Sequence, residues 1–344
     1  MRVGVVGCGY WGSKHVRVLS SVPEVEQVVI IEPDARRRDE LGRAFPGARL
    51  ASSLAEGLPQ IDAVVVATPA RTHAHLTRIA LEAGKHVLVE KPMATSTIEA
   101  VELANLAGER GLTLMVGHTF EYHEAVATLR GMIDAGDLGE LLHFNSARLN
   151  LGLYQPDVNV VWDLAPHDLS IINHLVGGAP KTVTCWGRAH AGHDVEDVAY
   201  LHLDYGDVTA QVHVSWLDPV KVRRLTAVGT RKMVVYDDMA VDDPIRIFDK
   251  GLDSSGDGRP AYRHNGSSAP AVRAGEPLAV EDQHFVECAM LGLTPRTGAA
   301  SGIAVTATLE AAEWSLRRGR PVAIEEVFEP ADLLVLPPTP VGGG

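Results

Sequence analysis

Short apolar runs alternate with stretches of helical periodicity over the first third of the chain. The apolar runs, each of which reads as a buried strand, cover residues 2–6, 27–31, 62–67, 87–89 and 112–116. Between the last two runs, apolar residues share one face of a helix expected over about 96–111. Repeated strand–helix units of this kind predict a doubly wound parallel sheet. We place the end of this first domain at residue 118.

The pattern changes in the second half of the chain. After a helical stretch at 120–135, strand-like segments follow one another, some joined by short turns such as Tyr205-Gly206-Asp207. These segments cover residues 141–149, 182–189, 195–203, 208–216, 222–229 and 231–236. Helices are expected again over 280–291 and 302–317. Successive strands with short turns predict an α+β domain with a largely antiparallel sheet.

We therefore expect an α/β protein whose second domain, residues 119–330, binds substrate and mediates oligomerisation. Residues 253–274 are rich in Gly, Ser, Pro and Asp, so we predict a mobile loop or lid there. Residues 331–344, rich in proline and glycine, are expected to form a flexible tail.

Length, charge and composition narrow the class of protein. At 344 residues the chain is too long for one ordinary core, which favours two domains. A formal net charge of −13 argues against binding to nucleic acid. No apolar run approaches the roughly 20 residues of a membrane helix, and the strand-like pattern from Arg2 onward leaves no room for a signal peptide. We expect a cytoplasmic protein.

Cysteine and histidine usage gives no indication of a metal site. The three cysteines, Cys8, Cys185 and Cys288, are far apart and form no CxxC pair. The fifteen histidines include no HExxH motif. An odd number of isolated cysteines fits a reducing compartment, and we expect no metal.

A glycine-rich loop, Gly7-Cys8-Gly9-Tyr10-Trp11-Gly12, follows the first strand and opens a helix. Gly7 permits a tight turn, Gly9 lets the backbone approach a pyrophosphate, and Gly12 lets helix and strand pack closely. A GxGxxG loop in this context predicts a Rossmann domain whose cofactor meets the loop, including Tyr10 and Trp11.

An acidic residue ends the second strand at the expected distance from this loop. Glu32 lies twenty residues beyond Gly12, where it would accept hydrogen bonds from the adenosine ribose and repel a 2′-phosphate. NAD is therefore favoured over NADP. The opposing signal is Arg36-Arg37-Arg38, which we interpret as a charged, exposed helix face with no ligand.

Polar residues also follow the later parallel strands. They are Thr68-Pro69, Glu90-Lys91-Pro92 and Gly117-His118, with His73 near the start of the next helix. Because open α/β sheets bind ligands at the carboxyl ends of their strands, we expect these residues near the cofactor. For His118, a ligand contact and a packed structural role both stay open.

The second domain carries an acid and a histidine before an apolar helix. Pro166 and Gly177-Gly178 predict a helix from about Pro166 to Val176, with His167 in its first turn. There the helix dipole would lower the pKa of His167 and keep the ring neutral, as a general base near pH 7 requires. Asp163, four positions earlier, could orient the ring or share a proton. Asp168 is more simply explained as an acid in the first turn that complements the helix dipole. The alternative to a catalytic role for the whole segment is a capped helix with polar residues on its rim.

The glycine loop, the Glu90-Lys91-Pro92 tip and the Asp163 and His167 pair together resemble the Gfo/Idh/MocA family of oxidoreductases, over essentially the whole chain. The resemblance implies that Lys91, Asp163 and His167 lie beside the nicotinamide. The runs 117–122 and 162–168 look most like the branch that oxidises or reduces nucleotide-linked sugars at C3. His123 departs from the asparagine that we would expect there.

This resemblance implies an NAD-dependent sugar dehydrogenase or ketoreductase. His167 would be the acid/base and Lys91 would stabilise the alkoxide, although the two could exchange roles. A nucleotide sugar needs cations for its diphosphate. Candidate substrate contacts are Tyr122, Arg148, Trp162, Lys221 and Arg223, with Arg224 on the opposite face of its strand. For the three basic residues Lys221, Arg223 and Arg224, and for Arg148, an exposed sheet face is an equally simple explanation.

Two other functions stay open at this point. A relative of the same family could act on a free polyol, as an inositol dehydrogenase does, and would not need the basic residues. A non-catalytic NAD-binding regulator could use the same fold, but it would have no use for Lys91, Asp163 and His167 together. In each case we expect a homo-oligomer, a dimer or tetramer, with the second domain's sheet facing a partner subunit.

Overall fold

The computed structural model describes residues 1–152, 158–191, 194–254, 260–273 and 275–328. The chain forms two compact units. The N-terminal unit contains Met1–Tyr122 and Glu276–Thr306, and the C-terminal unit contains His123–Gly275 and Ala307–Val327. Residues 276–306 therefore return to the first unit, although we had expected residues 119–330 to form one continuous domain. The tail expected at 331–344 lies outside the described residues.

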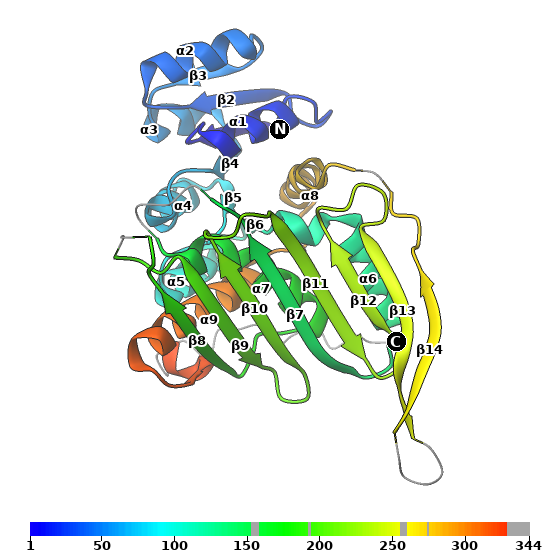
Figure 1. Ribbon diagram of the computed structural model, residues 1–344. Helices are drawn as coiled ribbons and strands as arrows, with labels where there is room; N and C mark the ends of the chain where they lie inside the picture. Colours follow the sequence, from blue (N-terminus) through cyan, green and yellow to red (C-terminus); the bar gives the residue numbers. More distant parts are fainter. Residues whose placement is uncertain (153–157, 192–193, 255–259, 274, 329–344) are drawn as a thin grey trace. The chain divides into compact units, whose positions relative to one another are not determined.

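A parallel sheet forms the centre of the N-terminal unit, as the strand–helix alternation predicted (Figure 1). Within the described residues it has six strands in the order β3-β2-β1-β4-β5-β6. Their bounds are β1 Arg2–Val6, β2 Gln27–Ile31, β3 Arg49–Ala51, β4 Ala63–Val66, β5 His86–Glu90 and β6 Leu114–Gly117. Val3 pairs with Val28 on one side and with Ala63 on the other. The order reverses at β1, which is where doubly wound sheets bind ligands.

Helices cover both faces of this sheet because alternate strand residues point to opposite sides. The helices are α1 Tyr10–Leu19, α2 Ala35–Ala44, α3 Leu54–Gly57, α4 His73–Glu82, α5 Thr97–Glu109 and α8 Pro277–Leu291. Short 3₁₀ turns cover Leu58–Gln60, Ala70–Thr72 and Thr119–Tyr122. Val64, Val66 and Val89 pack with residues of α4 and α5. On the other face, Val5 and Leu88 pack with α1 and α8.

The C-terminal unit is built on a larger sheet. Within the described residues it has nine strands in the order β14-β13-β12-β11-β7-β10-β9-β8-β15. All neighbouring pairs are antiparallel except β7 and β10, so the predicted largely antiparallel sheet is confirmed. The strands are β7 Leu141–Leu149, β8 Thr182–Arg188, β9 Val198–Asp204, β10 Thr209–Ser215, β11 Val222–Gly229, β12 Met233–Asp237, β13 Ile245–Ser254, β14 Pro260–Ser268 and β15 Val322–Ala323.

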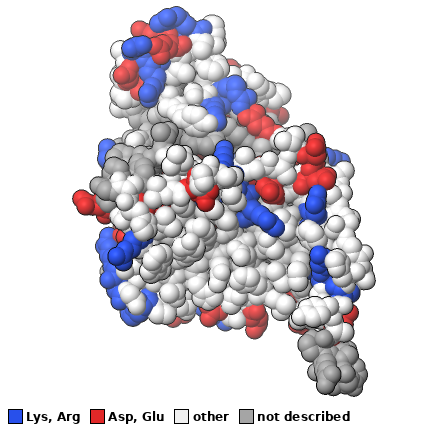
Figure 2. Space-filling view, in the orientation of Figure 1, with Lys and Arg blue, Asp and Glu red and all other residues white. Residues whose placement is uncertain are grey.

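One face of this sheet is covered and the other is exposed. Helix α7, Val160–Val176, packs across β7, β9 and β10, and α6, Glu124–Asp134, packs against α7 and β12 (Figure 1). Helix α9, Ala299–Arg318, and a 3₁₀ turn at Ile324–Val327 complete the described elements. Uncharged side chains predominate on the exposed face (Figure 2). Tyr200 on β9 is 47% exposed, and its ring stacks on His213 with centroids 4.1 Å apart.

Two predicted elements differ from the structure. Helix α7 begins at Val160, and Pro166 lies inside it, because Asn159 is the N-cap: its side chain accepts hydrogen bonds from the backbone of Val161 and Trp162. Within the loop or lid predicted at 253–274, residues 253–254 end β13 and residues 260–268 form β14, while 255–259 and 274 lie outside the described residues. Arg263 joins these two polar strands through an ion pair with Asp249 at 3.0 Å. No helix in the described part of the chain is long and apolar enough to cross a membrane.

Candidate functional site

The glycine loop has the geometry that a bound pyrophosphate requires. Gly7 has φ +82°, in the left-handed region that favours glycine, and its N–H donates to the Ile31 carbonyl at 3.1 Å. A Cβ on Gly12 would collide with the Gly7 carbonyl oxygen, so α1 passes against the loop only because Gly12 has no side chain. A Cβ on Gly9 would meet only the Arg37 guanidinium, at 3.9 Å. The loop therefore leaves room for a ligand at the helix amino terminus.

Glu32 is buried directly beside this loop. Its two carboxylate oxygens accept hydrogen bonds from the Cys8 N–H at 3.0 Å and the Asp34 N–H at 3.1 Å. The carboxylate is thus fixed at the end of β2, where a ribose would lie. Arg38 donates to the Glu32 carbonyl at 2.7 Å. The arginine triplet is not simply an exposed face, since Arg37 faces the same space as Glu32.

A cleft of about 600 Å³ collects most of the expected cofactor residues. It is lined by the glycine loop, including Tyr10 and Trp11, together with Glu32, Arg37, Ser52, Ser53, Thr68 and Pro69. Its volume lies within the range of small-molecule sites, and a few polar groups among apolar ones are typical of them. Tyr10 and Trp11 meet edge to face with centroids 5.4 Å apart, and the Lys14 ammonium lies 4.1 Å from the Tyr10 ring. These residues fit an adenine dinucleotide.

His73 holds two loops together and is not part of the cleft lining. It is buried, with Nδ1 2.7 Å from the Pro92 carbonyl and Nε2 2.7 Å from the Thr68 carbonyl. Burial lowers the pKa of His73, although both carbonyls oppose the shift. A direct cofactor contact was predicted for this residue. Its ring instead connects the Thr68 loop to the loop after Lys91.

The tip of β5 carries Glu90 and Lys91, followed by a cis peptide bond between Lys91 and Pro92. Glu90 is buried, and its Oε2 accepts the Lys91 backbone N–H at 3.1 Å. Burial would raise the pKa of Glu90, but a hydrogen bond from His15 and the charges of His15 and Lys91 lower it overall. Glu90 is therefore ionised at neutral pH.

His118 follows β6, beside the tip of β5. It is buried, and neither ring nitrogen has a hydrogen-bond partner among the described residues. Burial, reinforced by the charge of Lys91, lowers its pKa to about 4 against the opposing effect of Glu90. A neutral imidazole is thus held at the carboxyl edge of the sheet. Both interpretations of His118 stay open.

Tyr122 differs from its predicted place. It was expected to contact substrate, but it is buried in the core of the N-terminal unit. Its hydroxyl lies 3.1 Å from Thr297 Oγ1, and the Arg296 guanidinium lies 4.8 Å from its ring centroid. An aromatic ring with a satisfied hydroxyl explains this position by packing alone.

In the C-terminal unit, α7 presents Asp163 and His167 one turn apart on one face. Both are half-buried. Asp163 Oδ2 accepts a hydrogen bond from Trp216 Nε1 at 3.0 Å, so the carboxylate is held from the end of β10. His167 lies about two turns into the helix, and the dipole argument that placed it in the first turn is wrong. Asp163 lies one turn before it on the same helix face.

Asp168 and Arg148 form a buried ion pair. Arg148 Nε donates to Asp168 Oδ2 at 2.6 Å, and Ser146 Oγ donates to Oδ1 at 2.5 Å. Asp168 was expected as a helix-start acid, which is wrong because the helix begins eight residues earlier and the side chain points to the sheet. Arg148, which was a candidate for binding a substrate diphosphate, forms its ion pair with this carboxylate.

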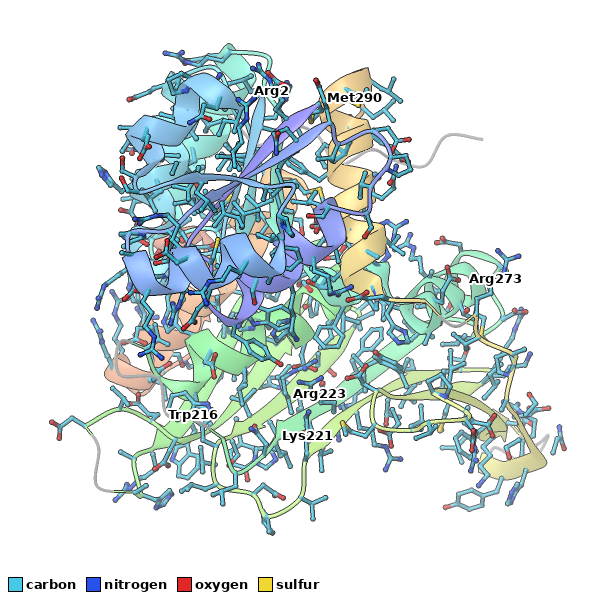
Figure 3. All side chains as sticks on the ribbon, turned by 90° about the horizontal axis from the view of Figure 1, so that it is seen from above. Arg2, Trp216, Lys221, Arg223, Arg273 and Met290 are labelled. Carbon is cyan, nitrogen blue, oxygen red and sulfur yellow. The ribbon has the colours of Figure 1, made fainter. Side chains whose placement is uncertain are left out.

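The other candidate cations lie around β11. Arg223 pairs with Arg148 across the β7–β11 ladder, and its Nη1 donates to Asp238 Oδ2 at 3.0 Å. Lys221 is exposed just before the same strand (Figure 3). Trp162 is buried on α7, with Nε1 3.3 Å from Glu313 Oε2. Both arginines thus have carboxylate partners, and Lys221 lies at the solvent edge of this group.

Several residues that build these sites were not singled out from sequence. Trp216 fixes Asp163, and Asp238 pairs with Arg223. His15, one turn beyond Gly12, contacts Glu90. Of these residues, only His15 could have been found from the sequence, as a histidine on the inner face of the helix that the glycine loop opens. In the described part of the chain, no group of three His, Cys, Asp or Glu side chains could hold a metal ion.

Family models match both units. A model described as "Oxidoreductase family, NAD-binding Rossmann fold" matches residues 1–118, and a GFO/IDH/MocA C-terminal domain model matches residues 126–235. The N-terminal unit is accordingly an NAD-binding Rossmann domain, which agrees with its cleft.

Two relatives are similar to the chain over most of its length. The scyllo-inositol 2-dehydrogenase (NADP(+)) IolW of Bacillus subtilis is 30% identical over 272 residues, 74% of each chain. The UDP-N-acetylglucosamine 3-dehydrogenase of Acidithiobacillus ferrooxidans is 34% identical over 218 residues, 60% of this chain and 65% of the relative, so the match spans just under two thirds of that enzyme.

The solved structure of the A. ferrooxidans enzyme aligns with a TM-score of 0.79 at 26% identity, over 92% of this chain and 98% of that one. GenD2 from gentamicin A biosynthesis, solved in complex with NAD, aligns with a TM-score of 0.79 at 29% identity, over 94% and 96% of the two chains. The relatives thus include dehydrogenases for a polyol and for a nucleotide sugar.

Proposed function

The chain belongs to the Gfo/Idh/MocA family of oxidoreductases, and on this basis we propose that it transfers hydride between NAD and a secondary alcohol or ketone of a sugar, at C3 of a nucleotide-linked sugar. The observation that carries the proposal is the Asp163 and His167 pair on one face of α7, with Asp163 held by Trp216. A domain that only binds NAD has no use for an acid/base pair fixed in this way.

The proposed mechanism assigns one task to each residue. When bound, NAD would supply the hydride acceptor for oxidation of the alcohol carbon, and NADH the hydride donor for the reverse reaction. His167 removes the hydroxyl proton as the carbon is oxidised, and Asp163 orients its imidazole. The Lys91 ammonium donates a hydrogen bond to the same oxygen and stabilises its developing negative charge. The glycine loop and Glu32 hold the dinucleotide.

A free polyol is the second candidate substrate, and one observation favours it. Arg148 and Arg223, expected to bind a diphosphate, are each paired with a carboxylate, Asp168 and Asp238. A nucleotide sugar would have to rely on Lys221 or displace one of these pairs. An inositol, by contrast, needs only hydrogen bonds. The A. ferrooxidans relative supports the first candidate and the B. subtilis relative the second.

The deciding experiment is a substrate panel. The purified protein is incubated with NAD or NADH and with UDP- and dTDP-sugars, their 3-keto forms and free inositols, while absorbance of the reduced nicotinamide is followed. We expect turnover with a nucleotide sugar and at least a hundredfold loss in a Lys91→Ala variant that still binds NAD. Turnover of inositol without inhibition by free nucleoside diphosphates selects the polyol. Tight NAD binding with no turnover of any sugar contradicts the proposal and favours the regulator.

We also propose that the protein is a homo-oligomer that pairs through the exposed sheet face. Light scattering coupled to gel filtration measures the mass, which should be a multiple of 36.9 kDa. A monomer at micromolar concentration would contradict this.

A further inference from the structure

A buried charged cluster connects the glycine-loop helix to the strand that ends at Lys91. His15 on α1 has an exposed fraction of 0%. Its Nδ1 lies 2.8 Å from Asp282 Oδ1 on α8, and its Nε2 lies 3.2 Å from Glu90 Oε1 on β5. Glu90 in turn accepts the Lys91 backbone N–H. All three elements belong to the N-terminal unit. This cluster has no part in the mechanism described above.

The hydrogen-bond geometry defines the protonation state of His15. A neutral imidazole carries one N–H, but both ring nitrogens of His15 face carboxylate oxygens. Only the imidazolium donates to both. Burial is the largest influence and lowers the pKa of His15, but the carboxylates of Asp282 and Glu90 together raise it well above its ordinary value. His15 therefore carries a positive charge at neutral pH.

Three further titratable groups near the cluster, Glu281, His73 and His118, are neutral at pH 7. Burial raises the pKa of Glu281 on α8 well above its usual range, and Thr119 Oγ1 donates to it at 2.8 Å. Burial lowers the pKa of His73 on α4 and that of His118 after β6, the latter to about 4. Asp282 is the carboxylate that faces His15 Nδ1; burial raises its pKa, and His15 opposes that shift. The cations that act on Glu90 here are therefore His15 and Lys91.

From this arrangement we infer that His15 is a positioning residue for the proposed hydride transfer. The His15 imidazolium pairs with the Glu90 carboxylate, so that this carboxylate does not draw the Lys91 ammonium away from the substrate oxygen. The inference rests on the proposed function. Helix α1 then has two roles. Its first residues follow the cofactor loop, and its His15 supplies the positive charge that pairs with Glu90, next to the proposed catalytic Lys91.

The test compares four proteins: wild type, His15→Gln, Glu90→Gln and the double variant, with the exposed His264→Gln as control. Glutamine keeps a hydrogen-bonding group but removes the charge. The Lys91 pKa is measured without substrate, from ¹³C NMR of reductively methylated lysines assigned with Lys91→Arg. In parallel, kcat, KM and the Kd for NAD are measured against pH.

We expect His15→Gln to raise the Lys91 pKa by about one unit, a tenfold change in its protonation constant. We expect kcat to fall about tenfold while the Kd for NAD stays within twofold. In the Glu90→Gln background the same substitution should change kcat less than twofold, because the carboxylate through which His15 acts is gone. His264→Gln should match wild type.

An unchanged Lys91 pKa in His15→Gln, or equal losses of kcat in the two backgrounds, overturns the inference. If no sugar is turned over but the Lys91 pKa rises as expected, the proposed function fails and the role of His15 toward Lys91 stands. Should His15→Gln fail to fold, Asp282→Asn provides the test, because it removes a negative charge from the same cluster. There the Lys91 pKa must not rise, and a rise counts against the inference.

Discussion

The buried ion pair of Arg148 and Asp168 supports a quantitative prediction about stability. Their side chains are 5% and 3% exposed, and the shortest N–O distance is 2.6 Å. Replacing Arg148 by methionine removes the guanidinium but fills similar space, which leaves the Asp168 carboxylate buried with the Ser146 hydroxyl still donating to it. Removing one partner of such a pair costs about 3–5 kcal/mol of stability.

The expected change in melting temperature follows from this cost. For a unit of this size each kcal/mol lowers the midpoint by about 2–4 °C, so Arg148→Met should melt roughly 6–20 °C below wild type. The double variant Arg148→Met with Asp168→Leu removes both charges, and it should recover most of the loss because apolar replacement of a whole buried pair is often neutral or stabilising. Circular dichroism during heating measures both.

The exposed pair of Arg36 and Glu40 is the matched control, and Arg36→Met should move the midpoint by about 2 °C or less. A double variant that melts as low as Arg148→Met would refute the reasoning, since the cost would then not come from the stranded charge. Activity of a stable double variant also decides whether Arg148 binds substrate: full turnover with unchanged KM removes it from the substrate contacts.

Three further predictions concern the cofactor site, the acid/base pair and pH. Gly12→Ala should raise the Kd for NAD at least tenfold, because its Cβ meets the Gly7 carbonyl oxygen, and titration calorimetry measures this Kd. An unchanged Kd would show that the loop shifts to accommodate the added Cβ. Trp216→Phe should lower kcat by about 10- to 100-fold with NAD binding intact, since a hydrogen bond to the Asp163 carboxylate is worth about 1.5–3 kcal/mol; an unchanged pH–rate profile and kcat would contradict this. Burial raises the pKa of Glu121 to about 8, so its contribution to stability is complete below pH 4.5 and is lost as pH rises toward 8. Urea unfolding at several pH values measures this fall of the unfolding free energy with pH. The fall should be smaller in Glu121→Gln, and an equally steep fall would argue against the assignment.

Local signals in the sequence were sufficient to predict most strands of the parallel sheet and several residues that line its cleft. The glycine loop, Glu32 and Thr68-Pro69 follow strands directly, and strand order alone brings them to one cleft. β3 was not predicted, because three residues carry too little periodicity. The hairpin of β13 and β14 was missed because its strands are polar and are held by pairs such as Arg263 with Asp249 rather than by an apolar face.

The substrate half could be predicted only in outline. The acid/base pair of Asp163 and His167 stays a prediction. The start of α7 was placed at Pro166 because proline usually marks a first turn, whereas Asn159 is the cap. Arg148 shows a more general limit. A basic residue at a strand end looks the same in sequence whether it meets a ligand or a buried carboxylate, and only the fold brings Asp168 to it, twenty positions away.

The return of α8 to the N-terminal unit also determines when that unit can be completed during synthesis. Phe285 and Leu278 of α8 fill the same core as Val3 and Val5, yet about 150 residues of the C-terminal unit are translated between Tyr122 and Glu276. At about 5–20 residues per second, the nascent Rossmann sheet waits roughly 8–30 s on the ribosome with one face covered by α1 but not yet by α8. A chaperone that binds exposed valine strands would find its target in this interval. The wait ends only when Asp282 emerges to meet His15, so the charge on that imidazole forms with the last step of assembly.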